Sequence, residues 1–139
     1  MARCLCSLAL VGCLLMTAAG AGPVFPELQK LQGAWVPEGA QCAKIFFRQG
    51  KSINFRRPGA TSREGVLIEG DRVGDGRQRC TIIKAKGDGD AYTILLTCFD
   101  GRSIWSKLSF SLRFSGDDKL IRSFADFPDE KLQLDRCRI

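Results

Sequence analysis

The sequence predicts an all-β fold, a small antiparallel meander β-barrel of about eight strands with a short N-terminal helical turn. Three observations predict it: apolar and polar side chains alternate along most of the chain, turn residues recur about every ten residues, and no long helical period occurs. Closing the sheet removes the two edges that an open sheet would expose. Because the chain is short, we expect side chains to fill most of the interior.

Residues 1–21 have the features of a secretory signal peptide. Arg3 supplies the positive charge, residues 5–16 are apolar, and small residues at 19–21 suit a cleavage site. The apolar stretch is too short to cross a bilayer as a stable helix, so no transmembrane segment is predicted. The alternative is a lipid anchor at Cys13, whose preceding residues resemble a lipoprotein processing box, although apolar residues follow it.

Residues 22–139 are predicted to form one domain, periplasmic or secreted, that opens with a helical turn at 27–31. The clearest strand is 104–114, where apolar side chains alternate with polar ones. Turns rich in glycine and aspartate, such as 87–90, separate the strands. The other strands are expected at 33–36, 42–48, 52–56, 65–73, 79–86, 92–98, 119–125 and 131–138. The predicted core includes Trp35, Ile104, Leu108, Phe110 and Leu112.

Four of the seven cysteines lie in this domain, and an even number in an exported domain indicates two disulfides. The midpoint of Cys80 and Cys98 is position 89, within the turn 87–90, so the two lie opposite or nearly opposite across that hairpin. Directly opposed residues of a hairpin have Cα atoms roughly 4.5–5.5 Å apart, within disulfide range. We therefore predict a Cys80–Cys98 bond, which leaves Cys42 to pair with Cys137 where the barrel closes. The alternative is that one or both pairs are shuffled or free.

The composition argues against an enzyme and predicts no cofactor and no metal. The chain has no histidine, which excludes Ser-His and Cys-His nucleophiles and histidine metal sites. Asp88 and Asp90 lie in a glycine-rich turn but lack the other oxygen ligands of a calcium loop. The sequence therefore predicts a non-catalytic binding module.

The formal net charge is +6, and several basic residues are close together in the first half of the domain. Such a cluster attracts anionic partners, so we expect a protein or an anionic surface component to bind there. Nucleic acid fits poorly, because aromatic residues are not interleaved with the basic ones. The alternative is that the charge serves solubility alone. The candidate partner-binding residues are Arg48, Lys51, Arg56, Arg57 and Arg63.

Residues 31–35 have the form L-x-G-x-W, which resembles the opening strand of calycin barrels such as lipocalins and avidins. The resemblance implies that Trp35 closes one end of the barrel and that a basic residue from a late strand packs over it. Arg136 is the candidate, because it shares a face with Leu132 and Leu134 and a guanidinium stacks well on an indole. The alternative is another small antiparallel barrel or sandwich.

Residues 31–42 are also similar to the start of small periplasmic inhibitors of serralysin-type metalloproteases. That resemblance implies a free N-terminal arm that enters the protease cleft, although those inhibitors have one disulfide and this domain has four cysteines. The arm is equally consistent with a disordered terminus. Two further functions stay open: a carrier of a small apolar or anionic ligand, and an envelope-associated structural or adhesive protein. The arm residues are Gly22, Pro23, Val24 and Phe25.

Overall fold

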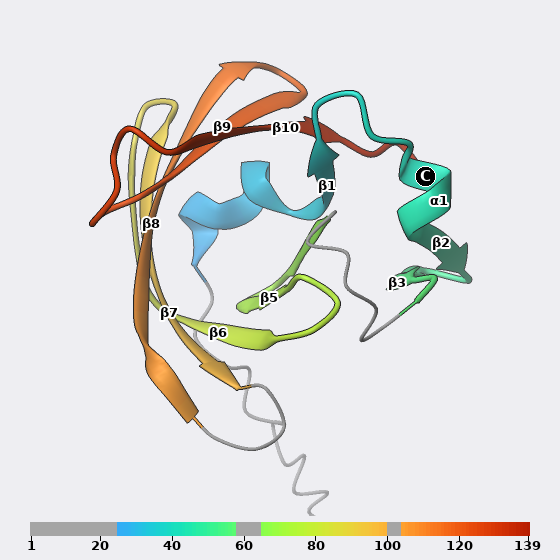
Figure 1. Cartoon of the computed structure of the whole chain (residues 1–139), viewed down its shortest axis with the longest axis horizontal. Helices are drawn as coiled ribbons and strands as arrows, with labels where there is room; N and C mark the ends of the chain where they lie inside the picture. Colours follow the sequence, from blue (N-terminus) through green and yellow to red (C-terminus); the bar gives the residue numbers. More distant parts are fainter. Residues whose placement is uncertain (1–24, 58–64, 100–103) are drawn as a thin grey trace, which may run out of the picture.

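The computed structural model describes residues 25–57, 65–99 and 104–139, and for residues 104–106 it describes the backbone alone (Figure 1). Eight antiparallel strands form a closed barrel in the order β1-β10-β9-β8-β7-β6-β5-β4, which confirms the predicted fold class. The strands are β1 (Gly33–Pro37), β4 (Val66–Glu69), β5 (Arg72–Gly74), β6 (Arg79–Asp88), β7 (Ala91–Phe99), β8 (Ile104–Gly116), β9 (Lys119–Phe124) and β10 (Lys131–Arg136).

The segment between β1 and β4 leaves the barrel instead of adding strands to it. It consists of α1 (Cys42–Ile45) and a two-stranded hairpin of β2 (Phe46–Gln49) and β3 (Ser52–Phe55). The predicted strand 42–48 is therefore wrong in its first half. Cys42 and Ile45 are one helical turn apart and both pack into a second core outside the barrel, which a helical turn allows and an alternating strand does not.

The predicted strand 65–73 is divided into β4 and β5 by a turn at Gly70. Gly70 has φ of 62°, a left-handed conformation that glycine adopts without steric cost. The side chain of Gln32 fixes this turn with two hydrogen bonds. Its Nε2 donates to Gly70 O at 3.2 Å, and Gly70 N–H donates to its Oε1 at 2.7 Å. This β4–β5 hairpin is how the barrel reaches eight strands without β2 and β3.

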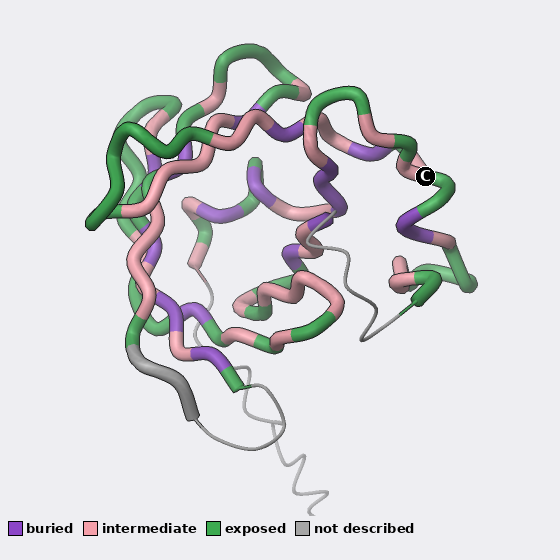
Figure 2. Tube along the Cα trace, viewed as in Figure 1, coloured by how far each residue is buried: buried purple, intermediate pink, exposed green. Residues whose placement is uncertain are grey.

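The main core lies on the inner faces of the barrel strands, and η1 (Pro26–Leu31) packs inside the ring at one end (Figures 1 and 2). Leu28 and Leu31 of η1 are fully buried there. Of the predicted core residues, Trp35 (0% exposed) and Leu112 (5%) are buried. Leu108 and Phe110 are only half-buried, because they line a cavity, and the side chain of Ile104 lies outside the described residues.

Both predicted disulfides are confirmed. Cys42 in α1 bonds to Cys137 after β10, with Cα atoms 5.6 Å apart, and Cys80 bonds to Cys98 directly across the β6–β7 hairpin, at 3.9 Å. Two disulfides are compatible with an oxidising compartment. None of the helices in the described ranges has the length and apolar character needed to cross a membrane.

Candidate functional site

The barrel interior contains a cavity of about 1050 Å³ that opens at the end opposite η1. Its apolar wall comes from β8, β9 and β10, and a narrower space of about 70 Å³ continues inward as far as Trp35. The expectation of a filled interior is therefore wrong. The physical reason is that the apolar residues of β2 and β3 leave the barrel to fill the second core. The wall residues are Leu108, Phe110, Phe124, Leu132 and Leu134.

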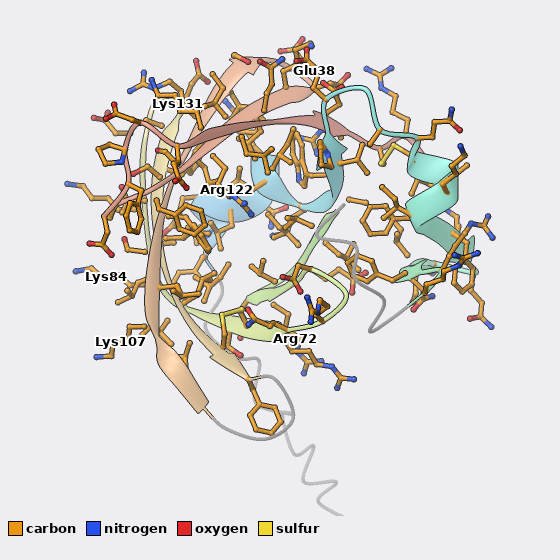
Figure 3. All side chains as sticks on the ribbon, in the orientation of Figure 1. Glu38, Arg72, Lys84, Lys107, Arg122 and Lys131 are labelled. Atoms are coloured by element: carbon orange, nitrogen blue, oxygen red, sulfur yellow. A yellow bond between two sulfur atoms is a disulfide. The ribbon has the colours of Figure 1, made fainter. Side chains whose placement is uncertain are left out.

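A charged residue, Arg122, lies on the inner face of this barrel. Side chains alternate along β9, and Leu120, two residues earlier, is 1% exposed and points into the core. Arg122 is directly opposite Leu112 of β8 and Leu132 of β10, so it shares their inward face. Figure 3 shows its side chain inside the ring, whereas Lys84 and Lys107 lie at the periphery.

The guanidinium of Arg122 lies beside a pair of aromatic rings whose centroids are 5.0 Å apart. Its central carbon lies 5.5 Å from the ring centroid of Phe110 and 5.2 Å from that of Phe124, within cation–π range. Its Nε is buried and has no hydrogen-bond partner among the described residues. Burial lowers the pKa of Arg122, and the opposing charge of Asp75 raises it to a smaller extent. A buried donor without an acceptor is costly, so this position favours an incoming anion.

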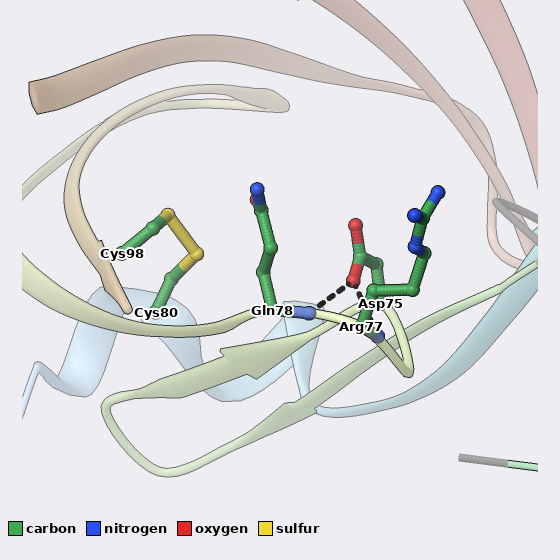
Figure 4. Close-up of a disulfide and its surroundings, with 5 residues drawn as sticks. All are labelled: Asp75, Arg77, Gln78, Cys80 and Cys98. Atoms are coloured by element: carbon green, nitrogen blue, oxygen red, sulfur yellow. Dashed lines mark hydrogen bonds between the residues drawn. A yellow bond between two sulfur atoms is a disulfide. The ribbon is translucent and has the colours of Figure 1, made fainter. Parts of the chain in front are cut away.

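Polar residues of the cavity rim come from the turn between β5 and β6 (Figure 4) and from the segment that leads from β9 into β10, which carries Asp129, Glu130 and Lys131. The backbone N–H groups of Arg77 and Gln78 donate to Asp75 Oδ1 at 2.9 and 2.8 Å. These bonds hold the Asp75 carboxylate in the turn. Among the described residues, Asp75 forms no ion pair with Arg122, so its charge acts on the pKa of Arg122 through space. The neighbouring disulfide at Cys80 fastens this side of the wall to β7.

The opposite end of the barrel is closed by the predicted pair of Trp35 and Arg136. The Arg136 guanidinium lies 4.2 Å from the indole centroid and donates to Gln32 O at 2.8 Å and Lys30 O at 2.6 Å. Trp35 Nε1 donates to Leu31 O at 2.9 Å. These bonds tie β1 and β10 to η1, so this end is sealed and the cavity opens at the other end.

The structure brings four of the five predicted basic residues, Arg48, Lys51, Arg56 and Arg57, onto β2, β3 and their flanks, all exposed. Arg48 donates to Ile139 O through Nε and Nη2, at 3.0 and 2.7 Å, and Arg56 donates to Ala43 O and lies over the ring of Phe47. Two of the four therefore also brace the local fold. The fifth residue, Arg63, lies outside the described residues.

The predicted N-terminal arm is described only at its last residue. Phe25 packs against the main core beside η1 and accepts a hydrogen bond from Leu28 N–H at 2.9 Å. Gly22, Pro23 and Val24 lie outside the described residues. The described end of the arm is thus part of the closed end of the barrel.

No protein-family model, curated protein or solved structure matches the chain. Within residues 25–57, 65–99 and 104–139, no group of three or more histidine, cysteine, aspartate or glutamate side chains could hold a metal ion. The functional argument therefore rests on the geometry of this molecule, above all on the cavity and Arg122.

Proposed function

We propose that the protein is an exported, non-catalytic binding protein that carries a small amphipathic organic anion in its barrel. The observation that carries the proposal is the buried Arg122 Nε, which has no acceptor among the described residues and lies beside the apolar wall of the cavity. Ligand sites are commonly apolar pockets with a few polar groups that fix orientation. The signal-like residues 1–21 and the two disulfides support a periplasmic or secreted location.

The position of Arg122 within the cavity indicates how such a ligand lies. The space of about 70 Å³ on the Trp35 side suits only a very small group, whereas about 1050 Å³ extends toward the mouth. An anionic head group therefore meets the guanidinium where the two spaces join, and the apolar body of the ligand lies outward against residues such as Leu108. A carboxylate or sulfonate suits a guanidinium, which donates through a planar fork of N–H groups.

Replacing Arg122 with leucine is expected to weaken the binding of an apolar anion by about 10- to 100-fold, the range for losing a hydrogen bond to a charged group. The measurement is a titration with a fluorescent fatty acid, followed by competition with unlabelled fatty acid and with the matching fatty alcohol. We expect the alcohol to compete poorly, because it leaves the guanidinium charge without a counter-charge.

Arg113→Leu is the matched control, because Arg113 is an exposed arginine on the neighbouring strand β8. It should bind the fatty acid as the unsubstituted protein does. Equal affinities for Arg122→Leu and the unsubstituted protein, or equal competition by acid and alcohol, would rule out the proposed ligand class.

The same substitution is expected to stabilise the protein in the absence of ligand. Leucine keeps apolar contact with Phe110 and Phe124 and removes a partly buried cation whose Nε has no acceptor in the described part of the chain. Replacing buried charges with apolar groups is often neutral or stabilising, and we expect a gain of about 1 kcal/mol in the free energy of unfolding. Urea unfolding of the two ligand-free proteins measures it; a clear loss of stability would show that Arg122 has a structural role.

Inhibition of a serralysin-type protease by the N-terminal arm stays a separate prediction. It requires cleavage after residue 21, which N-terminal sequencing of the exported protein determines. We then expect the full mature form to inhibit and a form lacking residues 22–25 to lose potency. Equal potency of the two forms would exclude the arm, and no inhibition by either would exclude this activity.

A further inference from the structure

Residues 41–57, which comprise α1, β2 and β3, form a unit that we call the basic hairpin. It contains five basic residues and no acidic residue, although the whole chain has fifteen acidic residues. All five basic residues are exposed: Lys44, Arg48, Lys51, Arg56 and Arg57. Figures 1 and 3 show the unit projecting from the side of the barrel, with nitrogen-tipped side chains around it.

Within the described part of the chain, only two of the five basic residues in the basic hairpin form hydrogen bonds that stabilise its fold. Arg48 and Arg56 make hydrogen bonds that brace the unit. The other three basic residues make no hydrogen bond or ion pair with a described residue, so their positive charges face solvent. They are Lys44, Lys51 and Arg57. Clustered cations of one sign attract a polyanionic partner, and the attraction weakens with salt.

We infer that the basic hairpin docks the protein on an anionic lipid bilayer. The unit is a projection rather than a groove, so it suits an extended anionic surface better than a peptide that needs a cleft. Each lysine or arginine close to an anionic bilayer strengthens binding by about fivefold. Five such residues on one projection are enough to hold a small domain reversibly at the membrane surface.

The choice of a bilayer also depends on where the unit lies, and in this respect the inference rests on the proposed function. Phe55 of β3 packs against Gly76, in the turn that carries Asp75 and Gln78, so closely that a methyl group at Gly76 would lie 3.3 Å from the Phe55 ring. That turn lines the mouth of the cavity. Docking through the basic hairpin therefore brings the mouth close to the bilayer, where amphipathic anions partition.

The test is co-sedimentation with vesicles of phosphatidylcholine alone and of phosphatidylcholine mixed with phosphatidylglycerol. We expect binding to the mixed vesicles only, lost at high salt. The variant Lys44→Gln/Lys51→Gln/Arg57→Gln should bind about 100-fold more weakly, from three residues at about fivefold each. The matched control is Lys84→Gln/Lys86→Gln/Lys107→Gln, which removes the same charge from exposed residues of β6 and β8 and should bind normally.

Three results would overturn the inference: no binding of the unsubstituted protein to mixed vesicles, equal loss in the two triple variants, or binding to a soluble acidic polymer without binding to vesicles. The fluorescent fatty-acid titration separates it from the proposed function. A hairpin variant that binds the fatty acid but not vesicles supports docking. Vesicle binding by a protein that binds no fatty acid would leave docking intact and exclude the carrier function.

Discussion

Removing the disulfide between Cys42 and Cys137 by double substitution to alanine is expected to lower the free energy of unfolding by about 4–5 kcal/mol. The two cysteines are 95 residues apart in the sequence, so the bond restricts most of the domain in the unfolded state. The chain-entropy model gives a loss of this size for a loop of that length. Urea unfolding of the oxidised proteins measures it.

The matched control removes the other disulfide, Cys80–Cys98, whose cysteines are only 18 residues apart. The same model gives a loss of about 3 kcal/mol for it. A larger loss from removing the short-range bond than from removing Cys42–Cys137 would contradict the entropic explanation and would point to local packing around Cys80 and Cys98 instead.

Replacing Trp35 with alanine is expected to cost about 3–5 kcal/mol, the range for truncating a large aromatic side chain in a packed core. The indole is fully buried, stacks under Arg136, and donates a 2.9 Å hydrogen bond to Leu31 O. The variant leaves an unfilled space at the sealed end and removes both contacts, so η1 loses its attachment to β1.

Thermal and urea unfolding measure the loss, and Phe127→Ala provides the comparison because Phe127 is 60% exposed. That substitution should change stability by no more than about 0.5 kcal/mol, as is usual for surface positions. A Trp35→Ala protein as stable as the Phe127→Ala protein would show that the closed end does not depend on the indole.

Much of the barrel could be predicted from the sequence, because period-two patterns and turn residues report local geometry. The turn at 87–90 predicted that Cys80 lies opposite or nearly opposite Cys98 across the β6–β7 hairpin, and a bulge between Ile82 and Lys84 sets the register that pairs them. Where apolar residues follow one another closely, the same pattern did not predict the number of strands. The run 65–73 suits one strand as well as two, and only the left-handed Gly70, held by Gln32 from a distant segment, decides between them.

The candidate site was predicted far less well, because its main residue looks ordinary in the sequence. Arg122 was not singled out, since a basic residue within a strand is usually assigned to the solvent face. The signal was present: Leu120, Arg122 and Phe124 share one face of β9, so the alternation places a charge among apolar residues. The size of the cavity could not be read from the sequence, because it depends on β2 and β3 leaving the barrel.

The second core outside the barrel has a consequence for how this molecule can change. The basic hairpin packs on its own cluster, including Ile45 and Phe46, and is fastened by its own disulfide, while the cavity is lined from the other face of the sheet. Substitutions at Arg122 and at Lys51 share no partners, so their free-energy effects should add. Ligand preference and surface affinity can therefore diversify independently on one scaffold, each by its own small set of mutations.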